Sequence, residues 1–197
     1  VLAIKPVLSW LENWAVKRAD KVNLVSRGFE EYFKTRYPRQ QFSFFTNGID
    51  AEFLNTTREA TQYAFQNTGL VTVLYAGNLG EGQGLHIIFP ALAKKLQGRA
   101  VFRVIGDGGC KEALRRGLDE FGIENVVLLP PVKRDGLIQE YLKADILFLH
   151  LNDHEAFRKV LPSKIFEYAA MGKPVWAGVS GYPAEFISAE VINAAVF

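Results

Sequence analysis

The sequence predicts an α/β fold in which helices cover both faces of a doubly wound parallel sheet. From residue 70 onward, short apolar runs alternate with helical patterns, and each run is apolar throughout rather than at every second position. That continuity is typical of strands buried on both faces, and the glycine-rich turn after the first run is typical of a strand-to-helix connection. Strands are expected at 70–76, 100–105, 125–129, 145–149, 174–177 and 191–197, and helices at 84–97, 110–121, 134–143, 163–171 and 182–189.

The residues before this region are too few to close a core of their own. Pro6 begins an amphipathic helix of three turns, in which Trp10 and Trp14 lie one turn apart and are expected to be buried. The elements expected next are a strand at 22–25, a helix capped by Ser26 and a strand at 42–45.

The domain boundaries follow from this change of pattern. We expect residues 1–48 to be the remnant of a partner domain, 49–69 a linker, and 70–197 a Rossmann-like domain. The run at 191–197 is strand-like with no helix to cover it, whereas a parallel edge strand normally needs such cover. The expectation is therefore a fragment whose second domain is truncated at its end.

Composition excludes several classes of protein. Of the 197 residues, 49% are hydrophobic and 22% are charged, the balance of a globular chain. Cys110 is the only cysteine, which excludes a disulfide framework and a zinc cage made of cysteines. No apolar run approaches the about 20 residues of a membrane span, and no signal peptide is visible, so we expect a soluble, cytoplasmic protein.

The net charge of +2 is too small for a general nucleic-acid binder. Its distribution is uneven, because residues 1–41 carry 8 basic and 4 acidic side chains, or +4, and the remainder carries −2. This basic, Trp-containing segment could lie against an acidic lipid surface. A solvated helix that has lost its packing partner is the alternative that we favour.

The loop after the first strand is the first candidate site. Gly77, Gly80, Gly82 and Gly84 fall within eight residues, so the backbone can turn tightly and approach a ligand. The amides at the start of the next helix then suit a diphosphate, although an ordinary flexible turn is the alternative. No Gly-Lys-Ser/Thr follows, which excludes a Walker loop, and Leu85 stands where the dinucleotide fingerprint needs its third glycine.

Two later segments extend the candidate site. Asp107 either imitates the ribose-binding acid of a dinucleotide site, which keeps an NAD-binding module open, or caps the following helix. Ser163 is expected to cap a helix whose first turn carries Lys164, and a cation there is favourable if an anion shares the site. Glu167 lies on the same helix face and can accept two hydrogen bonds from a vicinal diol such as ribose. A surface ion pair with Lys164 is the alternative.

The remaining histidines and the cysteine give weaker signals. His150 and His154 stand four residues apart, but His150 ends a predicted strand, so the two would not share a helix face and we expect no metal there. His86 is expected on a helix surface, and Cys110 as a buried or half-buried small side chain.

Six segments occur in a recognisable order: Asn47-Gly48-Ile49-Asp50, Tyr75-Ala76-Gly77-Asn78-Leu79, Gln83-Gly84-Leu85, Ile105-Gly106-Asp107-Gly108, Pro162-Ser163-Lys164-Ile165-Phe166-Glu167-Tyr168 and Gly172-Lys173-Pro174-Val175. In this order they resemble the carboxyl-terminal half of a GT-B glycosyltransferase. The resemblance covers nearly the whole chain. It is to the retaining group 1 (family 4) enzymes, and within them to amino-sugar transferases of the bacterial O-antigen and capsule type.

The resemblance implies two Rossmann-like domains with the active site between them, and transfer of a sugar with retention and without a metal or other cofactor. The second domain would bind the nucleotide-sugar donor, of which a UDP type is favoured. The acceptor, a growing and lipid-linked polysaccharide, would be reached through the missing domain, at the inner face of the bacterial plasma membrane. The implied donor-binding residues are Gly77, Asn78, Gly80, Glu81, Gly82, Gln83 and Gly84 against the diphosphate, Gly106 and Asp107 beside them, Val132 at the base, Ser163 and Lys164 at the phosphates, and Glu167 at the ribose.

Two departures from the family pattern matter. Asn78 and Gln83 stand where many members have an arginine and a lysine, so the leaving-group charge must be met by amides, helix dipoles and Lys164. Lys159 stands where the family often has a second glutamate, which leaves the catalytic residue unknown and makes Lys159 and Glu155 the candidates for a contact with the sugar.

By itself the chain is expected to bind donor weakly and to transfer nothing. The alternatives are a nucleotide-sugar 2-epimerase of the same fold and a non-catalytic NAD-binding or nucleotide-binding module.

Overall fold

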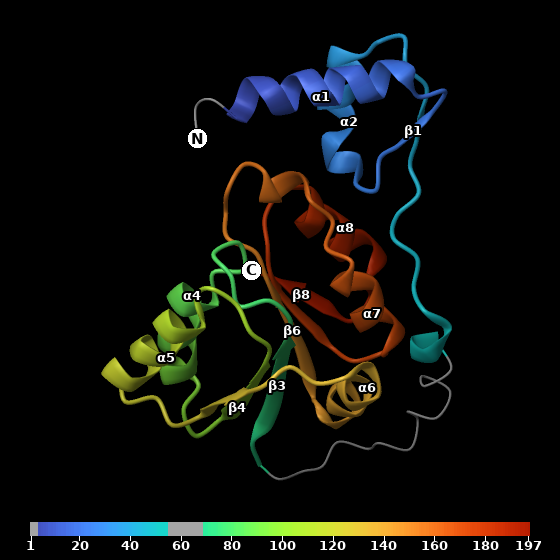
Figure 1. Ribbon diagram of the computed structural model, residues 1–197. Helices are drawn as coiled ribbons and strands as arrows, with labels where there is room; N and C mark the ends of the chain where they lie inside the picture. Colours follow the sequence, from blue (N-terminus) through green and yellow to red (C-terminus); the bar gives the residue numbers. More distant parts are fainter. Residues whose placement is uncertain (1–3, 55–68) are drawn as a thin grey trace.

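A six-stranded parallel sheet organises the second part of the chain (Figure 1). The structure, a computed structural model, describes residues 4–54 and 69–197. The strands are β3 (Val71–Ala76), β4 (Ala100–Ile105), β5 (Val126–Leu129), β6 (Ile146–His150), β7 (Val175–Gly178) and β8 (Ala194–Val196). Their order is β5-β4-β3-β6-β7-β8. The order therefore runs outward in both directions from the β3–β6 pair, which is the switch point of a doubly wound sheet.

Helices cover both faces of this sheet, as the apolar strands predict (Figure 1). Along β3, Leu74 belongs to one buried cluster and Tyr75 to the other, because successive side chains point to opposite faces. The helices are α4 (Leu85–Lys95) and α5 (Lys111–Glu120) on the Tyr75 side, and α6 (Arg134–Lys143), α7 (Lys164–Ala170) and α8 (Tyr182–Glu190) on the Leu74 side. The expected α/β fold class is confirmed.

The last strand is shorter than expected and is covered. Only Ala194–Val196 of the predicted 191–197 forms β8, which pairs with β7, and α8 packs on one of its faces. On the other face the ring of Phe197 lies 5.2 Å from that of Trp176. The expectation of an uncovered edge strand is therefore wrong, because α8 turns back over the strand that follows it.

The first part of the chain forms a small unit built on a parallel pair of two-residue strands. Its elements are α1 (Ile4–Arg18), β1 (Val22–Asn23), the 3₁₀ turn η1 (Arg27–Phe29), α2 (Glu30–Arg36) and β2 (Phe42–Ser43). Ser26 caps η1 rather than α2, since its hydroxyl accepts a hydrogen bond from the Gly28 amide at 3.3 Å.

The tryptophans of α1 lie in solvent, against expectation. Trp10 is 61% exposed and Trp14 is 47% exposed. The face of α1 that turns toward α2 is polar, because the Glu12 carboxylate accepts hydrogen bonds from the hydroxyls of Tyr37 at 2.7 Å and Tyr32 at 3.1 Å. These hydrogen bonds hold the Glu12 carboxylate toward α2, and apart from the buried Val16 the large apolar side chains of α1 remain exposed.

This unit and the segment that follows it both contact the sheet domain. The Ser26 hydroxyl donates a hydrogen bond to the Lys159 carbonyl in the 3₁₀ turn η3 (Phe157–Lys159), and a Cβ at Gly28 would collide with the same carbonyl. Residues 51–54 are helical, and the ring of Phe53 stacks against Tyr141 of α6 with centroids 6.2 Å apart.

The division at 1–48, 49–69 and 70–197 stays a prediction, and most of the proposed linker lies outside the described residues. None of the helices in the described residues is long and apolar enough to cross a membrane.

Candidate functional site

The glycine-rich loop lies at the switch point, between the loops that follow β4 and β6. On one side the Gly77 amide donates to the Ile105 carbonyl at 2.9 Å and the Leu79 amide to the Asp107 carbonyl at 2.8 Å. On the other side the Asn152 amide donates to the Gly82 carbonyl at 2.9 Å. Backbone hydrogen bonds to both neighbours fix the loop at the carboxyl edge of the sheet, where ligands bind in folds of this class.

Several positions in this region have no room for a side chain, and Gly106 and Gly84 show this most clearly. A Cβ at Gly106 would collide with the Gly77 carbonyl, so the first two loops can approach this closely only without a side chain there. Gly84 adopts a left-handed conformation with φ of 59°, and a Cβ there would strike the side chain of Asn152. The loop is therefore a closely packed turn.

The two neutral side chains of the loop, Asn78 and Gln83, are hydrogen-bonded to each other. The Asn78 amide donates to the Gln83 side-chain oxygen at 3.1 Å, and the buried Tyr75 hydroxyl donates to the Asn78 carbonyl at 2.7 Å. Burial raises the pKa of Tyr75, so its hydroxyl keeps the proton that it donates. Asn78 and Gln83 thus shape the loop but add no charge to it.

Lys164 supplies the positive charge. Its side chain lies over the loop, with Cε 3.0 Å and Nζ 3.5 Å from the point where a Cβ of Gly77 would stand. Burial lowers the pKa of Lys164, while the nearby Glu167 carboxylate acts in the opposite direction. A partly desolvated ammonium against side-chain-free backbone is a favourable place for an anion.

Glu167 is oriented by a tyrosine that the sequence did not reveal. The hydroxyl of the fully buried Tyr141 donates to Glu167 Oε2 at 3.0 Å. The ring of Tyr168 lies edge-on to Tyr141 at 5.3 Å and holds it in place. Burial, and then Tyr168 and Glu167, raise the pKa of Tyr141, so it remains a donor. The spacing of Tyr141 and Glu167 in the sequence gives no sign of this contact.

Other expected site residues stand apart from this centre. Ser163 is exposed and forms no capping hydrogen bond, because its own backbone is already helical at φ −57° and ψ −29°; its expected role as a helix cap is wrong. Asp107 does not cap α5, which begins after Cys110; it accepts from the Gly108 amide at 2.8 Å. Val132 is 41% exposed in the loop after β5. The Glu155 carboxylate, with its side chain 90% exposed, lies 3.5 Å from Lys159 Nζ.

The loop after β6 clamps the glycine loop through residues that sequence reasoning assigned no such role. His150 Nδ1 lies 2.6 Å from the Gln83 carbonyl, the Asn152 side-chain amide donates to the Glu81 carbonyl at 2.5 Å, and Phe157 packs against Gly82. Burial lowers the pKa of His150. His150 ends β6 and His154 lies in the loop after that strand, so the two imidazoles do not share a helix face.

A mostly apolar hollow of about 730 Å³ lies beside this site, but its walls do not include Lys164 or Glu167. It is lined chiefly by Ile87, Leu92, His150, Asn152, Gly178 and Phe197. The groups suited to a charged nucleotide therefore lie outside the hollow, around Gly77.

Comparison with known proteins agrees with this geometry. Residues 71–196 match the family model described as glycosyl transferases group 1. The chain is 26% identical over 167 residues to the Escherichia coli K12 protein named as the colanic acid biosynthesis glycosyl transferase WcaI. The aligned region covers 82% of this chain and 41% of that relative.

Solved structures show the same fold. Anabaena HepE in complex with UDP superposes with a TM-score of 0.71 at 21% identity, over 94% of this chain and 51% of that one. The lipopolysaccharide outer core galactosyltransferase WaaB gives a TM-score of 0.64 at 19% identity, over 91% of this chain and 48% of that one. The chain thus spans about half the length of these relatives, and the expected half of a GT-B fold is confirmed. This chain belongs to the group 1 glycosyltransferases.

Proposed function

We propose that this chain holds the nucleotide-sugar donor of a retaining glycosyltransferase, with a UDP-sugar as the favoured donor. The acceptor in this proposal is a growing, lipid-linked bacterial polysaccharide of the O-antigen or capsule type. The observation that carries the proposal is the placement of the Lys164 ammonium over Gly77, one helical turn from the Glu167 carboxylate. Support comes from HepE, whose structures hold UDP and UDP-glucose, and from the polysaccharide named for the E. coli relative.

The diphosphate gains negative charge as the bond to the sugar breaks, so the site must stabilise that charge more in the transition state than before. Asn78 and Gln83 are neutral and bonded to each other, which leaves Lys164 as the charged group beside Gly77. We assign the leaving diphosphate to Lys164 and to the backbone amides of the glycine loop. In this proposal Lys164 and these amides stabilise the leaving diphosphate, and the transfer uses no metal.

The ribose is assigned to Glu167. The hydrogen bond from Tyr141 uses one lone pair of Oε2, so Oε1 and the second lone pair of Oε2 can still accept hydrogen bonds from a ligand. Two ribose hydroxyls can donate to one carboxylate, which selects a sugar with a vicinal diol. Glu155 and Lys159 remain the candidates for a contact with the transferred sugar, since Phe157 of the same segment packs against Gly82.

The exposed tryptophans of α1 agree with the favoured reading, a helix that has lost its packing partner, and as the alternative to it we propose that α1 rests on the cytoplasmic face of the bacterial plasma membrane. Its exposed residues include Trp10 and Trp14, and Lys17 and Arg18 stand in its last turn. Apolar side chains beside basic ones suit an anionic lipid surface.

Titration of the 197-residue chain with UDP, GDP and NADH tests the donor site. We expect a nucleoside diphosphate to bind, and Glu167→Gln and Lys164→Met each to weaken binding by about tenfold to a hundredfold, the usual effect of losing a charge-assisted hydrogen bond. Glu185→Gln and Lys94→Met, which change exposed residues of α8 and α4, serve as matched controls and should bind like the parent. Binding of NADH alone would favour the dinucleotide reading, and parent-like binding by both site variants would show that the site is misplaced.

A further inference from the structure

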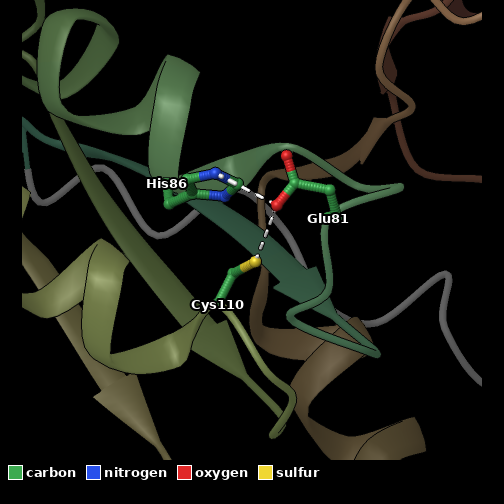
Figure 2. Close-up of side chains that lie close together, drawn as sticks. All are labelled: Glu81, His86 and Cys110. Carbon is green, nitrogen blue, oxygen red and sulfur yellow. Dashed lines mark hydrogen bonds and ion pairs between the residues drawn. The ribbon is translucent and has the colours of Figure 1, made fainter.

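A second cluster of reactive side chains lies where the glycine loop meets the starts of α4 and α5 (Figure 2). Glu81 comes from the loop, His86 from the first turn of α4, and Cys110 from the residue before α5. Glu81 Oε2 lies 3.3 Å from Cys110 Sγ and 3.7 Å from His86 Nε2. The three ligand atoms all lie within 4.8 Å of one another. This differs from the expectation that His86 is a helix-surface residue, because its side chain is only 17% exposed.

From this convergence we propose that Glu81, His86 and Cys110 form a binding site for a divalent cation of the zinc class. Carboxylate, imidazole and thiolate are the three ligand types that zinc takes, and three protein ligands leave a fourth position for water. Zinc bonds of about 2.0–2.3 Å place tetrahedral ligand atoms roughly 3.3–3.7 Å apart. The two distances from Glu81 Oε2 already have that length. A thiolate in the set disfavours Mg²⁺, which prefers oxygen ligands.

The backbone holds the three ligands together independently of their side chains. The Cys110 amide donates to the Leu79 carbonyl at 2.8 Å, which ties the start of α5 to the glycine loop two residues before Glu81. The helices α4 and α5 pack against each other, so His86 keeps its place relative to Cys110. A cation would therefore meet ligands that need only small side-chain movements, and it would pin the glycine loop to both helices.

The surroundings of His86 and Cys110 lower the affinity of the site for a cation. His86 Nδ1 is buried and has no hydrogen-bond partner among the described residues. A cation on Nε2 requires the ring proton on Nδ1, where no acceptor receives it, and loss of such a partner lowers metal affinity by about 10- to 100-fold. Burial and the hydrogen bond to Glu81 raise the pKa of the Cys110 thiol. When the sulfur becomes a ligand, its proton leaves to the buffer.

This inference can be tested apart from the donor site, because Zn²⁺ binding is measured without a nucleotide and the cation takes no part in the proposed transfer; Glu81 belongs to both sites. The test adds Zn²⁺ and Co²⁺ separately to the metal-stripped chain, with Mg²⁺ as a comparison. We expect one Zn²⁺ per chain, no competition from equal Mg²⁺, and with Co²⁺ an absorption band characteristic of a cobalt–thiolate bond. Cys110→Ser should abolish that band.

Three substitutions and two controls make the result specific. Cys110→Ser, His86→Ala and Glu81→Gln should each weaken Zn²⁺ binding by more than about tenfold. Tenfold is the smallest usual effect of losing a group that only hydrogen-bonds to a metal ligand. The control variants His154→Ala and Glu112→Gln change an exposed imidazole and an exposed carboxylate, and should bind Zn²⁺ like the parent. Absence of the thiolate band, or equal Zn²⁺ affinity in Cys110→Ser and the parent, overturns the proposal.

Discussion

Gly84 offers the sharpest test of how the glycine loop is built. Replacing it with alanine forces an L-residue into φ of 59° and brings a methyl group onto the Asn152 side chain. The left-handed conformation costs about 1–2 kcal/mol, and overpacking typically adds about 1–3 kcal/mol. We therefore expect Gly84→Ala to lower the free energy of unfolding by roughly 2–5 kcal/mol.

Two other glycines separate these contributions. Gly98 has φ of 76° but no neighbour within 4 Å, so Gly98→Ala should show only the backbone penalty of about 1–2 kcal/mol. Gly109 has neither a positive φ nor a close neighbour, and Gly109→Ala should change stability by less than about 0.5 kcal/mol.

The assay is urea unfolding followed by circular dichroism, extended to a double-mutant cycle. In the cycle, Asn152→Ala removes the side chain that the new methyl group strikes, so the double variant should be more stable than the sum of the single effects by about 1–3 kcal/mol. Equal destabilisation by Gly84→Ala and Gly98→Ala, with no coupling to Asn152, would refute the packed-turn description.

Three further predictions concern the site and α1. Tyr141→Phe should weaken UDP binding less than Glu167→Gln does, because it frees the carboxylate from its orienting bond without removing it; calorimetric titration compares the two. Lys164 has a pKa below its ordinary 10.5, so the folded protein binds fewer protons there than the unfolded chain, and stability should rise as pH increases from the lowered pKa toward 10.5. Lys164→Met should remove this contribution to the rise of the unfolding free energy with pH, measured by urea titrations at a series of alkaline pH values. Replacing both Trp10 and Trp14 with serine should reduce co-sedimentation with anionic phosphatidylglycerol vesicles, while neutral phosphatidylcholine vesicles bind neither protein.

Each of these has an outcome that contradicts it. Tyr141→Phe with a larger loss than Glu167→Gln would mean that the tyrosine, not the carboxylate, meets the ligand. If the unfolding free energy of Lys164→Met still rises with alkaline pH as in the parent, groups other than Lys164 cause that rise. Equal sedimentation with the two kinds of vesicle would exclude an anionic lipid surface for α1.

The fold could be predicted closely because its signals are local. Apolar runs such as 100–105 and the glycine loop mark buried strands and their turns within a few residues, and the structure places β4 at Ala100–Ile105 as expected. The same local signals predict a doubly wound parallel sheet, but they do not give the order of its strands, which depends on pairing between distant segments.

What failed depends on contacts between distant residues. The exposure of Trp10 is decided by Glu12 and Tyr37, which lie 25 residues apart, and the orientation of Glu167 by Tyr141, 26 residues away. Ser163 carries the right side chain for a cap, but its backbone is already helical. Its hydroxyl therefore accepts no hydrogen bond from an amide of the first turn. Spacing along the chain does not reveal such pairings.

A crystal structure of this chain grown with UDP would show directly where the nucleotide binds. We expect the diphosphate within hydrogen-bonding distance of Lys164 Nζ and of the glycine-loop amides near Gly77, and the ribose hydroxyls on Glu167. UDP bound in the apolar hollow near Phe197, with Lys164 and Glu167 untouched, would contradict it.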